Sequence, residues 1–137
     1  EVLHIKDGNP QATIVGNLAT GEGIPRDNFD CIILTQTLHC IYEVKSAVIN
    51  SYHALRPGGV LLVTLQGISQ TVRYDMDRWG DYWRFTVLSA RRLLEEAFSP
   101  ENIKVESYGN VLAAVAFLHG LAAEELKERD LDYQDQS

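Results

Sequence analysis

The chain has 137 residues, of which 45% are hydrophobic and 23% charged, so it is typical of a single globular domain and not of a disordered or fibrous chain. Its 12 basic and 19 acidic residues give a net charge of −7, which argues against a nucleic-acid partner, because binding to a phosphate backbone depends on basic side chains. The longest apolar run, residues 111–123, is shorter than the ~20 residues that span a bilayer, and no signal peptide is visible, so we expect no membrane partner and a cytoplasmic location.

Three short apolar runs predict strands, at Ala12–Leu18, at Cys31–Thr35 with its flanking residues, and at Val60–Leu65. The last two runs each contain four apolar residues in succession, Cys31–Leu34 and Val60–Val63. Continuous apolar strands are typical of a parallel sheet that helices cover on both faces. The sequence therefore predicts an α/β fold with three layers and a mostly parallel sheet.

A helix is predicted between the second and third of these strands, and Pro57-Gly58-Gly59 is expected to end it. Strand, helix and strand in this order form a right-handed crossover unit. The apolar face of the helix is expected to consist of Val44, Ala47, Val48, Tyr52 and Leu55.

A second helix is predicted from about Val87 to Phe98, with Thr86 as its N-cap. Its inward residues are expected to be Leu88, Leu93, Leu94 and Phe98.

The last third of the chain predicts a strand, a helix and a tail. The strand is expected at Ile103–Tyr108, and Asn110 is expected to cap a helix from Val111 to about Lys127. Gly120 weakens that helix by about 1 kcal/mol relative to Ala. We expect one domain over residues 1–130 and a disordered acidic tail over residues 131–137.

Several familiar site motifs are absent from the sequence. Gly21-Glu22-Gly23 predicts a turn, because a dinucleotide fingerprint needs three spaced glycines that lead directly into a helix. There is no phosphate-binding loop of the GxxxxGK[ST] type and no nucleophile turn. Cys31 and Cys40 are expected to be reduced and in or near the core, and no metal site is predicted from them or from the histidines.

Three polar segments form the candidate site. Residues 35–39 and 66–70 each follow a predicted parallel strand, at the edge of the sheet where open α/β proteins bind ligands. Residues 71–85, the lid segment, combine five aromatic residues with alternating charges, which suits a cover over a polar small molecule. The alternative for the lid segment is a covering loop with internal salt bridges.

The string from Phe29 to Thr64 resembles the S-adenosylmethionine-dependent methyltransferases with a Rossmann-like fold. It is similar to their fourth and fifth strands: a strand that begins with Phe-Asp, a polar turn, a Leu-His pair, a helix, Leu-Arg-Pro-Gly-Gly and an apolar strand. Residues 83–98 resemble a later helix of the family, and the resemblance covers roughly residues 12–108. Residues 73–85 are similar to a subgroup of bacterial methyltransferases found near, or fused to, glycosyltransferases of surface-polysaccharide biosynthesis.

The resemblance implies S-adenosyl-L-methionine as the cofactor. Asn17 stands where the family has an acid that binds the adenine amino group, and its side-chain carbonyl can accept the same hydrogen bond. Thr35 and Gln36 match the turn that faces the methionine part of the cofactor. The cofactor-binding residues are thus expected to be Asn17, Leu18, Thr35, Gln36 and Leu38.

If methyl transfer needs a base, His39 is the first candidate, since an unperturbed imidazole titrates near neutrality. Asp75 and Asp77 in the lid segment are the second candidates. The substrate is expected to bind Tyr74, Arg78, Trp79 and Trp83.

The family's glycine-rich first strand and its second strand would lie before Glu1, and its seventh strand would follow the last helix. The absent strands are interior neighbours of those present, and unpaired buried backbone is costly. We therefore expect a chain that belongs to something longer, that rearranges its pairing, or that completes its sheet with another chain, such as a second copy in a homodimer.

The leading hypothesis is transfer of a methyl group to an oxygen or nitrogen of a small molecule, such as a sugar or polysaccharide precursor. The alternatives are a non-catalytic interaction domain of a larger protein and a different nucleotide-binding α/β protein.

Overall fold

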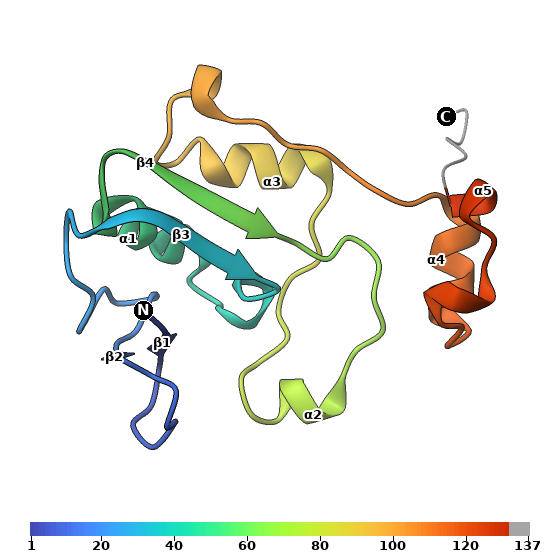
Figure 1. The fold of residues 1–137 in the computed structure, drawn as a ribbon, viewed down its shortest axis with the longest axis horizontal. Coiled ribbons are helices and arrows are strands. Elements are labelled where there is room, and N and C mark those ends of the chain that lie inside the picture. Colours follow the sequence, from blue (N-terminus) through green and yellow to red (C-terminus); the bar gives the residue numbers. More distant parts are fainter. Residues whose placement is uncertain (132–137) are drawn as a thin grey trace.

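The computed structural model describes residues 1–131, and these residues form two small parallel sheets with helices beside them (Figure 1). In one sheet β1 (Leu3–His4) pairs with β2 (Ile14–Val15), and in the other β3 (Phe29–Thr35) pairs with β4 (Leu55–Thr64). The parallel α/β fold class expected from the sequence is confirmed. The predicted tail, apart from Leu131, lies outside the described residues.

The crossover from β3 to β4 contains α1 (Val44–Ala54), as the sequence predicts. Its buried side chains are Val44, Ala47, Val48 and Ser51, which follow the i, i+3, i+4, i+7 spacing of one helical face. Tyr52 lies beside this stripe and is exposed, so its predicted inward position is wrong.

The strand β4 begins directly after α1, earlier than the predicted start at Val60. Leu55 pairs with Phe29, and the regular register then runs from Cys31 opposite Val60 to Thr35 opposite Thr64. Gly59 permits this early pairing, because a Cβ at that position would lie 3.0 Å from the carbonyl oxygen of Arg56.

The helix α3 (Val87–Leu94) begins at the predicted cap. Thr86 Oγ1 accepts a hydrogen bond from the backbone N–H of Ser89 at 3.1 Å, and Ser89 Oγ accepts one from the N–H of Thr86 at 2.9 Å. The helix ends before Phe98, and Leu88 is 68% exposed, in contrast to its predicted inward position. The predicted inward positions of Leu93 and Leu94 are confirmed, and Ala90 is buried beside them. Phe98, also predicted to point inward, packs against the core from beyond the end of the helix.

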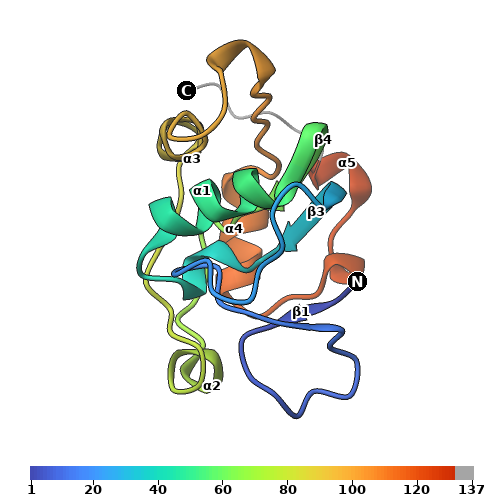
Figure 2. The same ribbon diagram turned by 90° about the vertical axis from the view of Figure 1, so that its left-hand side faces the viewer.

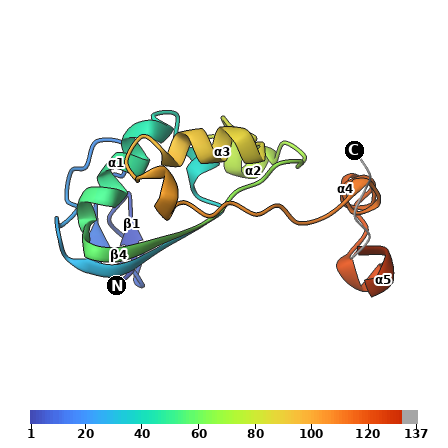
Figure 3. The same cartoon turned by 90° about the horizontal axis from the view of Figure 1, so that it is seen from above.

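The sheet of β3 and β4 has one covered face and one open face. Figure 3 shows α1 and α3 on the same side of β4. Alternate strand residues point to opposite faces. Ile32, Leu34, Leu61 and Val63 pack against the core, whereas Cys31, Ile33, Val60 and Leu62 are exposed. We call these last four residues the outer face.

The described residues thus supply two of the three expected layers, because none of their helices covers the outer face. The exposure of Cys31 also contradicts its predicted core position, while both cysteines are free, as expected.

Residues 103–108 do not form the predicted strand; they have no ladder partner within the described chain and run extended toward α4 (Val111–Leu118). Asn110 caps this helix as predicted, with its Oδ1 accepting from the N–H of Ala113 at 2.8 Å.

The helix α4 ends well before Lys127. Gly120 adopts φ +80°, and the N–H of Leu121 donates to the carbonyl of Ala116, so a glycine-terminated Schellman motif stops the helix. The short α5 (Glu128–Leu131) follows, and Figure 1 shows α4 and α5 beyond the sheet; in Figure 2, seen from the left-hand side of Figure 1, α4 lies behind it. No helix in the described part of the chain is long and apolar enough to cross a membrane.

Candidate functional site

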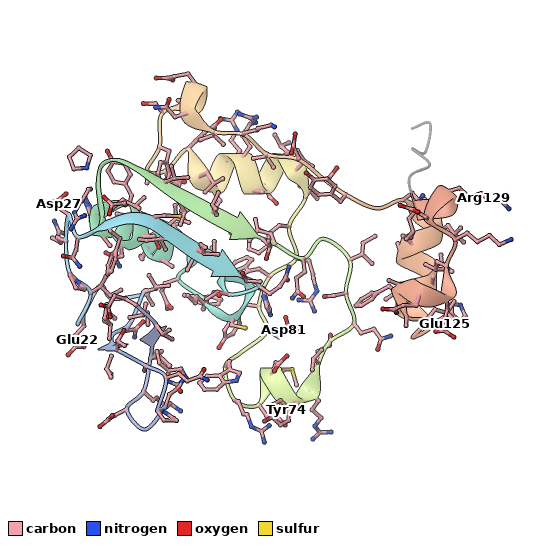
Figure 4. The ribbon with its side chains drawn as sticks, in the orientation of Figure 1. Glu22, Asp27, Tyr74, Asp81, Glu125 and Arg129 are labelled. Carbon is pink, nitrogen blue, oxygen red and sulfur yellow. The ribbon has the colours of Figure 1, made fainter. Side chains whose placement is uncertain are left out.

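A cavity of about 290 Å³ opens at the carboxyl ends of β3 and β4. It is bounded by the loop after β3, the loop after β4 and the lid segment, so the three segments singled out in the sequence meet there. Figure 4 shows Asp81 near the ends of the two strands and Tyr74 on α2 (Arg73–Met76) of the lid segment. The lining residues are Gln36, His39, Cys40, Gln66, Gln70, Val72, Asp75, Trp79 and Asp81.

The loop after β3 is fixed by backbone geometry and by one buried leucine. Gln36 has φ +49°, and its N–H donates to the carbonyl of Thr64 at 3.2 Å, which ties the ends of the two strands together. Leu38 is completely buried in the core cluster. The chain therefore turns so that His39, the next residue, lies in the cavity wall.

His39 and Cys40 contact each other inside the cavity, with Cys40 Sγ 3.2 Å from His39 Nε2. Burial raises the pKa of the Cys40 thiol, and the nearby carboxylates of Asp75 and Asp81 raise it further. Because the thiolate is the nucleophilic form, Cys40 is a protonated thiol near neutral pH and is unsuited to nucleophilic catalysis.

The carboxylate of Asp81 is held by Arg84. Both guanidinium Nη atoms of Arg84 donate to it, Nη2 at 2.9 Å, and the Asp81 side chain is only 4% exposed. These hydrogen bonds lower the pKa of Asp81, so its negative charge persists at neutral pH. Arg84 also donates to the carbonyl of Gln70 at 3.2 Å, which fastens the end of the lid segment to the loop after β4.

The second half of the lid segment is anchored by three further contacts. Trp79 packs edge-on against His4 of β1, with ring centroids 5.6 Å apart. The N–H of Tyr82 donates to the carbonyl of His39 at 2.8 Å, and Trp83 Nε1 donates to the carbonyl of Ile41 at 3.0 Å. The lid segment is thus a cover with internal and external bonds, which combines features of both predicted alternatives.

The structure brings four of the sequence-predicted residues into the cavity wall: Gln36, His39, Asp75 and Trp79. The other catalytic candidate, Asp77, lies outside the wall and faces Arg73 at 3.6 Å.

The other predicted substrate residues do not line the cavity. Arg78 stacks over the ring of Tyr74, with its guanidinium carbon 3.4 Å from the ring centroid. Trp83 packs on the core and stacks on Tyr42.

The remaining predicted cofactor residues are also outside the cavity. Thr35 is exposed at the end of β3, and Leu18 and Leu38 are core residues. The side-chain Oδ1 of Asn17 accepts a hydrogen bond from the N–H of Ala19 at 2.8 Å, so it is engaged in its own turn.

The described residues fit only part of S-adenosylmethionine. The carboxylate of Asp75 gives the cavity a negative group that suits a sulfonium or ammonium ion, whereas the charge of Asp81 is balanced by Arg84. The volume is slightly below the 300–1,000 Å³ typical of small-molecule pockets, and of the predicted cofactor residues Gln36 alone lines the cavity. The fit is therefore limited to the charged end of the cofactor.

Five of the residues that line the cavity are not among the site residues predicted from the sequence. Gln66 and Gln70 lie in the polar loop already noted, and Val72 and Asp81 lie in the lid segment, so their segments were found but not their roles. Nothing in the local pattern singles out Cys40, which enters the wall because it follows His39 around a short turn.

Residues 4–63 match a family model described as a methyltransferase domain. No curated protein and no solved structure matches the chain. The matched region runs from β1 through nearly all of β4 and includes Gln36 and His39, but it ends before the lid segment. Residues 4–63 thus resemble a methyltransferase domain, and the structure is consistent with a partial Rossmann-like α/β fold of that kind.

Proposed function

We propose that this chain binds S-adenosylmethionine and transfers its methyl group to an oxygen or nitrogen of a small molecule held in the cavity, with a sugar or polysaccharide precursor as the acceptor class. The cavity carries this proposal, because it gathers polar side chains from three segments at the carboxyl ends of parallel strands. It does so in a chain whose residues 4–63 match a methyltransferase domain.

His39 is the proposed proton acceptor. Cys40 Sγ lies 3.2 Å from His39 Nε2, and the raised pKa of the thiol makes Cys40 a donor to that nitrogen. For methyl transfer this S–H contact would have to give way to the acceptor, so that the hydroxyl or amine donates to Nε2 and passes its proton there as the acceptor atom becomes nucleophilic. S-adenosylmethionine, when bound, supplies a methyl group on a positively charged sulfur.

Asp75 and Asp81 have different proposed tasks. Asp81 is committed to Arg84 and keeps the lid segment in place. Asp75 lines the cavity, and no hydrogen bond or ion pair from the described residues engages its carboxylate, so this is the carboxylate that we assign to orienting the acceptor or balancing a cation. The lid segment limits access of water, which favours alignment of the reacting groups.

A second function is favoured by one specific observation. Asn17 Oδ1 accepts a hydrogen bond within its own turn, Leu38 is completely buried, and neither residue lines the cavity, so two of the expected cofactor residues lie away from it. A non-catalytic interaction domain derived from a methyltransferase would have no need of them.

Calorimetric titration of the chain with S-adenosylhomocysteine separates the two functions. Binding at about micromolar Kd, followed by release of S-adenosylhomocysteine from S-adenosylmethionine in the presence of hydroxyl or amino sugars, supports the enzyme. If circular dichroism shows that the chain is folded and the titration shows no heat of binding, the methyl-transfer proposal fails and the interaction domain is favoured.

A further inference from the structure

The outer face of the β3–β4 sheet is an apolar surface without a cover. Ile33 is 67% exposed, and Val60 and Leu62 are each 51% exposed. Ile33 stands directly opposite Leu62 in the strand register, so these side chains form one continuous patch. The alternate residues of the same strands are packed into the core, which shows that the patch arises from the lack of a layer on this side and not from a poorly formed sheet.

A second uncovered apolar surface lies on α4. No residue of this helix is charged, and its sequence is Val-Leu-Ala-Ala-Val-Ala-Phe-Leu. Four of its large side chains are about half exposed: Leu112, Val115, Phe117 and Leu118. A helix that is apolar on all sides is typical of a buried position.

The helix is held where it cannot cover the outer face of its own chain. Gln70 Nε2 donates to the carbonyl of Leu118 at 2.8 Å, which fixes α4 to the loop after β4. Figures 1 and 3 show α4 beyond the carboxyl ends of the strands, at the end of the extended segment that begins near residue 103. In this position α4 does not cover the sheet of β3 and β4, and its large apolar side chains stay about half exposed.

The total surface supports the same conclusion. The chain exposes 9839 Å², whereas a folded monomer of 15.4 kDa exposes about 7,200 Å². The surplus of about 2,600 Å² is well above the ~800 Å² that each partner buries in a standard protein interface.

We propose that two copies of this chain associate by exchange of α4, so that the helix of each copy packs on the outer face of the other. The contact is isologous, since the same two surfaces meet twice around a twofold axis. The contact joins two uncharged surfaces, so the net charge of −7 on each copy only makes the two copies repel each other. Because added salt screens this repulsion, it is expected to strengthen the dimer. The inference does not depend on the proposed methyl transfer.

Light scattering coupled to size-exclusion chromatography tests the dimer. The unaltered chain is expected at twice its monomer mass, whereas Leu62→Glu and Val115→Glu are expected to be folded monomers by circular dichroism. Leu88→Glu is the matched control, because Leu88 is also exposed and belongs to neither surface, and it is expected to remain a dimer. A monomeric unaltered chain at high concentration, or a dimer that survives both substitutions, overturns the proposal.

The native Cys31 on the outer face allows a second test that works even if the glutamate variants fail to fold. In a Cys40→Ser background, Leu112→Cys and Val115→Cys are introduced separately and the chains are oxidised. The proposal expects a disulfide between two chains, seen as a dimer on a non-reducing gel, for at least one of the two positions. A disulfide within one chain, or none at either position, contradicts the exchange.

Discussion

Arg84 holds both carboxylate oxygens of Asp81, and this bond within the lid segment fixes the part of the segment that lines the cavity. The same guanidinium reaches the carbonyl of Gln70, so one side chain links the lid segment to the loop after β4. Gln70 in turn binds the end of α4. The closure of the cavity and the position of the last helices are therefore connected through three side chains.

The Asp81→Asn variant should be less stable than the unaltered chain by about 1–2 kcal/mol at neutral pH, because a charge-assisted pair becomes a weaker neutral contact. The pKa of Asp81 is lowered in the folded state, so its contribution is complete above the unfolded pKa near 3.8 and is lost as the pH falls through the folded value. Urea titrations from neutral pH to about pH 2 should show the difference between the two chains shrink over that range. A difference that is constant with pH would contradict the ion-pair explanation.

Cys40 should react slowly with iodoacetamide, and the pH midpoint of its reaction should lie above the ~8.5 of a free thiol. The reason is that burial and the charges of Asp75 and Asp81 raise its pKa. The rate is measured in a Cys31→Ser background. The Asp75→Asn change should lower the midpoint, while Asp77→Asn, which removes a carboxylate outside the cavity, should leave it unchanged.

His39→Gln should reduce turnover about 10²-fold while changing the affinity for S-adenosylhomocysteine little, since a general base acts on the transition state. His53→Gln serves as the control, because His53 lies on α1 and outside this cavity. Turnover is followed as release of S-adenosylhomocysteine with an accepted sugar. Equal turnover of the unaltered chain and His39→Gln would remove His39 as the base.

Thr86→Ala should lower the free energy of unfolding by about 1 kcal/mol, because the cap of α3 loses its hydroxyl acceptor. Thr86→Ser keeps the hydroxyl and should recover most of that loss. Urea titration of the three chains at neutral pH checks both values. Equal stability of the alanine and serine variants would show that the cap contributes nothing.

Gly23→Ala should be far more destabilising than Gly8→Ala. Both glycines have positive φ, but a Cβ at Gly23 would lie 2.3 Å from the carbonyl oxygen of Val15, whereas nothing lies within 4 Å of one at Gly8. Backbone strain alone costs an alanine about 1–2 kcal/mol, and only Gly23 adds a clash with backbone. Thermal melts of the two variants provide the comparison, and equal losses would contradict the close approach.

The sequence by itself determined those features that depend on neighbouring residues. The apolar periodicity located β3, α1 and β4, and the hydroxyl and amide side chains of Thr86 and Asn110 marked the starts of α3 and α4. The rule that ligands bind at the carboxyl ends of parallel strands found the three segments around the cavity. Each of these signals is local, because periodicity and caps act within one or two helical turns.

The tertiary structure decided what depends on partners far away in the chain. In the tertiary structure β2 pairs with β1, and residues 103–108 have no strand partner among the described residues. Asp75 on α2 lies in the cavity wall, whereas Asp77, just after the helix, lies outside it. The fold also placed both flanking helices on one face of the sheet, although the apolar strands predicted cover on two. An apolar strand shows that burial is favourable, but only the positions of the other elements determine whether anything is there to bury it.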